Sequence, residues 1–326
     1  MYDRLNATTI DRQHTMLRTA MGPAIAEALA DPKVIEVMVN PDGKLWIDRH
    51  GDGRIDTGEH VGAIQTERII RLVASHIGQE CHADRPVISA ELPENGERFE
   101  GLLPPITVAP CFSIRKPAQV IYELIDYVEA QIMTPIQASA LSQAVADRKN
   151  IVVVGGTSSG KTTLVNALLS EVATSGDRVV MIEDTRELHC AAADCVGLRT
   201  KPGIASLDDL VRSTLRLRPD RIIVGEVRGP EALDMLKAWN TGHPGGITTL
   251  HANSAQAGLY RLEQLIQEAV VTVPRRFIAE AIDVVVFLKG RNSGRRVETV
   301  ATLEGLNTDG DYVLKSLTPI HLVPSV

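Results

Sequence analysis

The stretch GGTSSGKTT at residues 155–163 has the residue types and spacing of a phosphate-binding loop, G-x-x-x-x-G-K-[ST]. Its glycines let backbone N–H groups curl around an anion, and the helix expected to begin at Lys161 directs its positive end at the phosphates. Lys161 is suited to reach the outer phosphates, and Thr162 to bind Mg²⁺. An apolar stretch precedes the loop and a helical pattern follows it, so the sequence predicts a nucleoside triphosphate site. Phosphate contacts are expected from Gly155, Gly156, Thr157, Ser158, Ser159, Gly160, Lys161, Thr162 and Thr163.

Two further segments carry acidic residues where a strand is expected to end. Glu226 follows an apolar run and Gly225. Beside the phosphate loop, a carboxylate at the end of a strand faces the ligand crevice and can hold a Mg²⁺-bound water or polarise the attacking one. In MIEDTREL, Glu183 and Asp184 end another strand and Glu187 follows one helical turn later. This cluster can hold a metal ion or its waters, and a solvated charged turn is an equal alternative. The expected metal ligands are Thr162, Glu183, Asp184 and Glu226.

The segment TGHPGGITTLHAN contains His243 and His251 on either side of a Pro-Gly-Gly turn. These residues alone leave three interpretations open, which are a metal site, an ordinary turn and a device that senses a phosphate.

The composition of the 326-residue chain limits the classes of protein to consider. A formal net charge of −7 argues against a protein whose whole surface binds nucleic acid, although it is compatible with a local basic groove. Four scattered cysteines are too few for a disulfide framework, and His189, Cys190 and Cys195 match no common zinc pattern. Neither a signal peptide nor an apolar run of membrane-spanning length is found, which predicts a cytosolic protein, at most peripheral to a membrane.

The elements that position these residues are expected to form two parts. Residues 1–20 are predicted to be an N-terminal tail, 21–115 a small α+β domain and 116–133 a linker with some helix. From residue 134 to 326, apolar strands alternate with helices, which is typical of a mainly parallel sheet covered on both faces. The expected strands are 151–154, 179–182, 222–225 and 247–250, the helices are 161–170, 207–218 and 231–240, and an edge hairpin turns at Asn292-Ser293-Gly294.

In this order, GGTSSGKTT, MIEDTREL, LRLRPDRIIVGEVRGPEALDML and TGHPGGITTLHAN resemble the motifs of the traffic ATPases of type II and type IV secretion systems. Within that superfamily the chain is most similar to the TrbB-type conjugal transfer ATPases, and VMVNPDGKLWID and FSIRKP extend the resemblance over nearly the whole chain. The resemblance implies an α/β fold in which a RecA-like P-loop ATPase domain follows a smaller N-terminal α+β domain.

The resemblance also implies a function. A homohexamer would hydrolyse ATP with Mg²⁺ to power conjugal transfer or type IV secretion, through pilus assembly or substrate translocation. The hexamer would work in the cytoplasm, peripheral at the inner membrane. Its partners would be inner-membrane and cytoplasmic components of the secretion apparatus, and no tightly bound nucleic acid is expected.

Roles for single residues follow from the same resemblance. Residues 155–163 match Walker A, and Gly225 and Glu226 match Walker B, with Glu226 orienting the attacking water. His243 and His251 match the family's His box, so the glycines between them are expected to bring this turn against the active site. One histidine, for which His251 is favoured, would then contact the γ-phosphate or Glu226.

The remaining roles concern the acidic cluster and the N-terminal domain. Glu183, Asp184 and Glu187 lie in the family's Asp box, and Arg98 and Arg115 match arginines of the N-terminal domain that contact the phosphates. The expected catalytic residues are therefore Glu226, Lys161, His251, His243, Glu183 and Glu187.

Two other functions compete with this interpretation. A RecA-like nucleic-acid motor is disfavoured by the acidic charge and by an aromatic content of 3%, because base stacking needs aromatic side chains. The basic residues Arg291, Arg295 and Arg296 are expected to be a solvated hairpin tip. A nucleotide-gated assembly scaffold with little turnover is disfavoured by Glu226, which a pure binding protein does not need.

Overall fold

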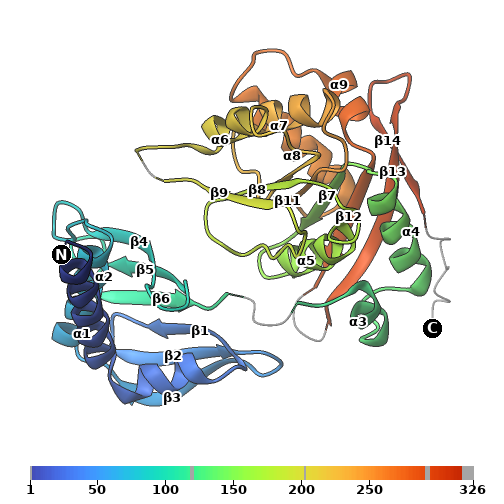
Figure 1. Cartoon of the computed structure of the whole chain (residues 1–326). Helices are drawn as coiled ribbons and strands as arrows, with labels where there is room; N and C mark the ends of the chain where they lie inside the picture. Colours follow the sequence, from blue (N-terminus) through green and yellow to red (C-terminus); the bar gives the residue numbers. More distant parts are fainter. Residues whose placement is uncertain (1, 118–120, 202, 291–293, 318–326) are drawn as a thin grey trace, which may run out of the picture. The chain divides into compact units, whose positions relative to one another are not determined.

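The computed structural model describes residues 2–117, 121–201, 203–290 and 294–317, with side chains in the first segment from residue 14 onward (Figure 1). The chain divides into two compact units, Met1–Gln119 and Val120–Val326. The sequence suggested a tail over 1–20 and a linker over 116–133, but both segments contribute to hydrophobic cores. Leu17 is buried in the first unit, and Leu124 and Tyr127 are buried in the second.

The first unit is a six-stranded antiparallel sheet with two helices packed on it. The strand order is β3-β2-β1-β6-β5-β4. Gly43 closes the expected hairpin between β1 and β2 with φ +81°, and a Cβ atom there would lie 2.4 Å from His60 Nε2. The elements are α1 (Tyr2–Ala30), β1 (Val34–Val39), β2 (Lys44–Arg49), β3 (Gly53–His60), α2 (Ala63–His76), β4 (Val87–Glu91), β5 (Arg98–Leu102) and β6 (Cys111–Arg115).

The second unit is an eight-stranded sheet in the order β14-β13-β12-β7-β11-β10-β8-β9. The strands from β12 to β9 run parallel, and β13 and β14 are antiparallel additions. The helices are α3 (Leu124–Glu129), α4 (Pro135–Ala146), α5 (Lys161–Val172), α6 (Leu207–Thr214), α7 (Glu231–Asn240), α8 (Ala255–Gln267) and α9 (Arg275–Ala281). The strands are β7 (Ile151–Gly155), β8 (Val179–Glu183), β9 (Cys195–Arg199), β10 (Arg221–Val224), β11 (Ile247–His251), β12 (Val284–Lys289), β13 (Arg296–Leu306) and β14 (Tyr312–Ser316).

Helices cover both faces of this sheet (Figure 1). Ile151 and Val153 of β7 pack in one core with α3, α4 and α5, whereas Val152 and Val154 pack in a second core with α6 to α9. Successive side chains of a strand point to opposite faces, so a strand covered on both sides must be apolar at every position. The apolar strands and the α/β class predicted from the sequence are thereby confirmed.

Two local predictions differ from the structure. The helix expected over 207–218 ends earlier, at Thr214. Arg218, which precedes Pro219, adopts φ +53° and so avoids the right-handed helical region that is disfavoured before proline. The hairpin of β12 and β13 is not at the edge, since β12 pairs with β7 and β14 forms the edge instead. Its predicted turn at Asn292-Ser293-Gly294 falls largely outside the described residues.

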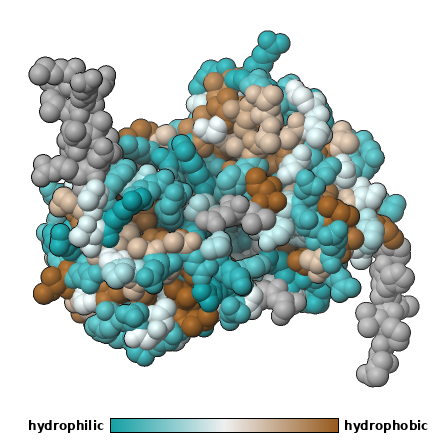
Figure 2. Space-filling view, turned by 60° about the horizontal axis from the view of Figure 1, so that its bottom comes forward, coloured by the Kyte–Doolittle hydropathy of each residue, from teal (hydrophilic) through white to brown (hydrophobic). Residues whose placement is uncertain are grey.

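The surface is mainly polar. Over the face shown in Figure 2, hydrophilic residues predominate and hydrophobic residues form small, separate groups. Within the described part of the chain, none of the helices combines the length and the apolar character needed to cross a membrane.

Candidate active site

Four parallel strands end at the same edge of the large sheet and bring the predicted motifs together. Gly155 ends β7, Glu183 ends β8 and His251 ends β11, while Glu226 follows β10 by two residues. The register pairs His251 directly with Gly155. Because β10 lies between β11 and β8, its loop carries Glu226 between His251 and Glu183. Residues that are far apart in sequence thus form one polar group at this edge.

The phosphate-binding loop joins β7 to α5 in a conformation that requires its glycines. At Gly155 an added Cβ atom would lie 2.5 Å from Ser159 Oγ and 2.8 Å from the Leu288 carbonyl oxygen. Gly160 is the N-cap of α5 and adopts φ +95°. Thr157 and Ser158 are exposed at the tip of the loop, whereas Gly156, Thr162 and Thr163 are half-buried. A loop that ends in the N-terminus of a 12-residue helix is suited to bind phosphate.

Lys161 supplies the charge that such a ligand needs. Its side chain is buried, and Nζ lies 3.1 Å from the carbonyl oxygens of both Gly155 and Gly156. It also lies 3.2 Å from His251 Nδ1. An ammonium group at this position beside the loop is suited to bind an anion such as a phosphate.

His251 connects Lys161 to Glu226. His251 Nε2 lies 2.7 Å from Glu226 Oε1, a close contact that is not an aligned hydrogen bond, and within the described chain this buried oxygen has no hydrogen-bond partner. Burial lowers the pKa of His251 and the charge of Lys161 lowers it further, while Glu226 opposes both. The imidazole is therefore neutral at neutral pH and the Glu226 carboxylate can accept a hydrogen bond from a water molecule.

Arg228 is a member of this group that the sequence analysis did not identify. Its Nε donates to Glu226 Oε2 at 2.9 Å, and a second guanidinium nitrogen lies 3.8 Å from Asp184 Oδ2. It thereby holds the Glu226 carboxylate from the side opposite to His251. A basic residue two positions after the predicted catalytic acid was the signal in the sequence.

The Asp box is a turn held against α5. Glu183 Oε1 accepts the backbone N–H groups of Glu187 and Leu188 at 2.9 and 2.8 Å. Asn166, which the sequence analysis also missed, donates to the Glu187 carbonyl oxygen at 3.0 Å. Asp184 accepts a hydrogen bond from Thr200 Oγ1 at 2.8 Å. Glu183 thus orders the turn that follows β8 through its side chain.

The residues at the start of α5 fit Mg²⁺ better than they fit a metal ion whose ligands all come from the protein. Thr162 Oγ1 donates to Glu187 Oε2 at 3.3 Å, which places a hydroxyl and a carboxylate side by side at the start of α5. In the described ranges, no three histidine, cysteine or acidic side chains gather as a metal site. Mg²⁺ typically takes one or two protein oxygens and completes its shell with phosphate and water.

His243 does not join this group. It precedes β11, whose other end carries His251, and its Nδ1 lies 2.8 Å from the Pro219 carbonyl oxygen. A five-residue strand spans about 13 Å, so the two histidines lie at opposite edges of the sheet. The expectation that the glycines bring this turn against the active site is therefore corrected: Gly245 and Gly246 bind Asn150 Oδ1 through their N–H groups, at the start of β7.

Gly246 has a packing role that predicts a loss of stability on substitution. A Cβ atom there would lie 2.0 Å from the ring of Trp239, which is buried and whose Nε1 donates to the Ile222 carbonyl oxygen at 3.0 Å. We expect Gly246→Ala to lower the free energy of unfolding by about 1–3 kcal/mol, the usual cost of overpacking. Urea unfolding would measure this, with Gly197→Ala as the control because no atom lies within 4 Å of its added Cβ. Equal stability of the two variants would contradict the packing role.

Arg98 and Arg115 belong to the first unit. They face each other across β5 and β6 in the antiparallel register, and both side chains are exposed. The same register places Glu91 beside Arg98 and Glu36 beside Arg115. Two adjacent arginines repel each other, and the neighbouring carboxylates offset this repulsion. The phosphate contact of Arg98 and Arg115 stays a prediction.

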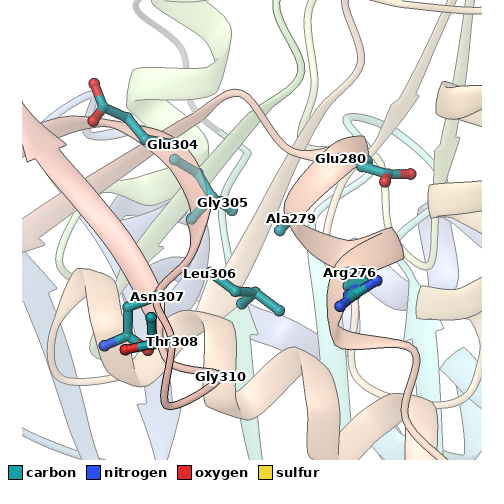
Figure 3. A pocket seen from close by; sticks show the side chains of 10 residues that line it. Arg276, Ala279, Glu280, Glu304, Gly305, Leu306, Asn307, Thr308 and Gly310 are labelled. Atoms are coloured by element: carbon teal, nitrogen blue, oxygen red, sulfur yellow. The ribbon is translucent and has the colours of Figure 1, made fainter.

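A cavity of about 480 Å³ in the second unit shares no residue with the polar group around Lys161. It lies between α9 and the turn that connects β13 to β14 (Figure 3). In that view the carboxylates of Glu280 and Glu304 point away from the space beside Leu306. The cavity holds none of the residues predicted for nucleotide binding or catalysis, so the predicted chemistry stays with the group around Lys161.

Comparisons with known proteins agree with the sequence motifs. The conjugal transfer protein TrbB of Rhizobium radiobacter is 48% identical over 291 residues, which cover 89% of this chain and 90% of the relative. The type IV secretion system protein PtlH of Bordetella pertussis is 33% identical over 321 residues, covering 85% of this chain and 93% of the relative.

A solved structure supports the fold. The pilus retraction motor PilT with bound ADP matches with a TM-score of 0.61 over 91% of this chain and 83% of that chain, at 20% identity. The pattern of the family described as "Type II/IV secretion system protein" matches residues 25–289. This chain therefore belongs to the type II/IV secretion system protein family.

Proposed function

We propose that this protein hydrolyses ATP to ADP and phosphate in a Mg²⁺-dependent reaction and thereby powers conjugal transfer or a related type IV secretion process. The observation that carries the proposal is the contact series from Lys161 through His251 to Glu226 at the mouth of the phosphate-binding loop. This contact series supports the proposal, because an ammonium group suited to bind the terminal phosphate lies close to a carboxylate suited to orient water. The similarity to a conjugal transfer protein supports the process that the reaction drives.

The catalytic residues act mainly by position and charge, as phosphoryl transfer requires. Lys161 and the N–H groups at the start of α5 neutralise the phosphates. Glu226 accepts a hydrogen bond from the attacking water through Oε1, while Arg228 fixes the other oxygen of the carboxylate. Thr162 and Glu187 are the oxygen ligands that would hold Mg²⁺, which neutralises phosphate charge when bound. Glu183 contributes by ordering the Asp-box turn.

The assembly and its partners form the second part of the proposal. The protein works as a homohexamer in the cytoplasm, peripheral at the inner membrane, with other components of the secretion apparatus. Arg98 and Arg115 of the first unit contact the phosphates in that assembly.

The proposal is tested by measuring phosphate release from ATP with and without Mg²⁺, while light scattering gives the molar mass. Mg²⁺-dependent release by a species of six chains is the expected result. Tight ATP binding without release would contradict it and favour the assembly scaffold. Strong stimulation by single-stranded DNA would instead favour the nucleic-acid motor.

The lowered pKa of His251 predicts how activity depends on pH. As the pH falls through this pKa, the imidazole becomes a cation beside Lys161 and repels it. We therefore expect the rate to fall on the acid side, at a pH below the ordinary histidine value of about 6.5. In His251→Gln the rate at neutral pH is lower, by about 10-fold or more, and this acid limb disappears.

Rates of phosphate release between about pH 5 and 8 would measure the effect. Folding stability follows the same sign, because a histidine whose pKa is lowered on folding disfavours the folded state as pH falls below its unfolded value. Replacement of His243, which lies at the other edge of the sheet, is the matched control. An unchanged acid limb in His251→Gln would show that another group titrates.

A further inference from the structure

Arg295 lies against the phosphate-binding loop, contrary to the expected solvated hairpin tip. A Cβ atom on Gly160 would lie 3.0 Å from Arg295 Nε, 3.1 Å from its Cζ and 3.2 Å from its Cδ. The guanidinium group thus covers the backbone at the N-cap of α5. Arg296, the next residue, instead forms an exposed ion pair with Glu298 at 3.0 Å.

This position is electrostatically unfavourable without an anion. The N-terminus of a helix carries a partial positive charge, and a guanidinium group placed there is repelled. Over the described ranges, Arg295 makes no ion pair with an acidic side chain, and its buried Nε–H has no hydrogen-bond partner. Burial raises the pKa of the nearby Tyr127 phenol, and the charge of Arg295 only partly opposes this increase. The phenol is therefore neutral and cannot neutralise the Arg295 guanidinium group.

The backbone holds Arg295 in this place. Gly290 adopts φ +83°, and an added Cβ there would lie 2.0 Å from the Gly294 carbonyl oxygen, so these two residues approach each other closely. On the other side, Val297 donates its N–H to the Ile132 carbonyl oxygen at 2.7 Å and accepts from Gln137 Nε2 at 3.0 Å. The backbone two residues after Arg295 is thus fixed by two hydrogen bonds, which hold Arg295 beside the loop.

The sheet order indicates which part of a nucleotide Arg295 can reach. β11 and β12 flank β7 on opposite sides. Lys161 Nζ contacts His251 at the end of β11, so the terminal phosphate belongs on the β11 side. A triphosphate chain that ends there has its α-phosphate and ribose displaced toward β12, where Arg295 lies.

We propose that Arg295 is a nucleotide-binding residue that donates hydrogen bonds to the α-phosphate of the nucleotide held in the loop. The inference rests on the proposed ATPase function. The α-phosphate would accept a hydrogen bond from the buried Nε–H of Arg295. It would also be an anion shared by two positive groups, the Arg295 guanidinium and the N-terminus of α5. Arginine suits such a site because its fork of donors can engage two phosphate oxygens.

Calorimetric titration of ADP and of inorganic pyrophosphate into the full-length protein would test this assignment. We expect Arg295→Ala to weaken ADP binding on the order of 10- to 100-fold, as for the loss of a hydrogen bond to a charged group. Pyrophosphate can occupy the Lys161 side of the loop without an α-phosphate, so its affinity should change little. Arg295→Lys should restore part of the ADP affinity through its charge.

Arg296→Ala is the matched control, because it removes the neighbouring arginine, whose ion pair with Glu298 lies outside the loop. It should bind ADP like the wild type. Thermal unfolding of each unliganded variant shows whether the hairpin remains intact, and Arg295→Gln serves if the alanine variant does not fold.

The outcomes separate the two proposals. Unchanged ADP affinity in Arg295→Ala, or an equal loss for ADP and pyrophosphate, would overturn the role of Arg295 and leave the ATPase proposal standing. A wild-type protein that binds neither compound would overturn the ATPase proposal, and the role of Arg295 with it.

Discussion

Replacing Glu226 with glutamine is expected to lower the rate of phosphate release from ATP by at least about 100-fold while ATP binding stays close to that of the wild type. Glu226 Oε1 is buried, accepts no hydrogen bond in the described chain and lies 2.7 Å from His251 Nε2. The amide keeps the shape of the carboxylate but loses its charge, so it orients water poorly. Lys161 and the loop glycines, which bind the phosphates, are not altered.

Rapid phosphate detection gives the rate, and calorimetric titration with a non-hydrolysable ATP analogue gives the affinity. Glu280→Gln is a suitable control, because this exposed glutamate of α9 lies in the cavity of Figure 3 and not at the phosphate-binding loop. Turnover of Glu226→Gln within about threefold of the wild type would mean that another group positions the water. Loss of ATP binding in this variant would point to a structural role for the carboxylate instead.

The largest expected loss of stability comes from Asp177→Ala. Arg221 is 1% exposed, and its Nε lies 2.6 Å from Asp177 Oδ2, while Arg148 binds the other carboxylate oxygen. Removing Asp177 leaves the buried Arg221 charge without its partner. We expect the free energy of unfolding to fall by about 3–5 kcal/mol, the typical cost of breaking a buried pair on one side. Urea unfolding measures it.

The matched control is Glu304→Ala, which removes a surface ion pair with Lys315. That pair has an N–O distance of 3.1 Å and exposed side chains, and its loss should cost about 1 kcal/mol or less. A similar small effect for both variants would show that Arg221 is solvated or finds another partner when Asp177 is absent.

The same carboxylate predicts a dependence of stability on pH. Burial raises the pKa of Asp177, but hydrogen bonds from Arg221 and Ser175 and the charges of both arginines outweigh burial, so the net pKa is lowered. A carboxyl group whose pKa is lowered on folding stabilises the protein above its unfolded pKa. This stabilisation is lost as the pH falls through the lowered folded value, and Asp177→Ala should therefore show a weaker loss of stability in acid.

Local sequence determined much of the second unit. The phosphate-binding loop, the alternation of apolar strands and helices, and the acid after β10 are each specified by neighbouring residues, because backbone conformation and strand periodicity are short-range properties. The family could be identified for the same reason, since its motifs are short and ordered. Helix boundaries are not specified in the same way, and α6 ends at Thr214, four residues before the predicted end at 218.

The tertiary structure decided which of the predicted residues meet. His243 and His251 lie in one short segment, yet a strand between them sends them to opposite edges of the sheet. The sequence predicts Glu183 as a metal ligand, and this stays a prediction; the structure adds that its Oε1 accepts backbone N–H groups of the following turn. Spacing along the chain does not reveal such differences, because they depend on strand direction and on the partner that each polar group finds.

Arg228 and Arg295 show the limit of the sequence most clearly. No motif specified either contact: Arg228 binds Glu226, which lies two residues before it, whereas Arg295 lies at the site because strands distant in sequence are neighbours in the sheet. Leu288 pairs with Gly155, and Val297 pairs with Leu288, which sets Arg295 beside the phosphate-binding loop. The sequence by itself determined the loop, the acid and the fold class. Strand order and register, which are long-range properties, decided which charged side chains surround them.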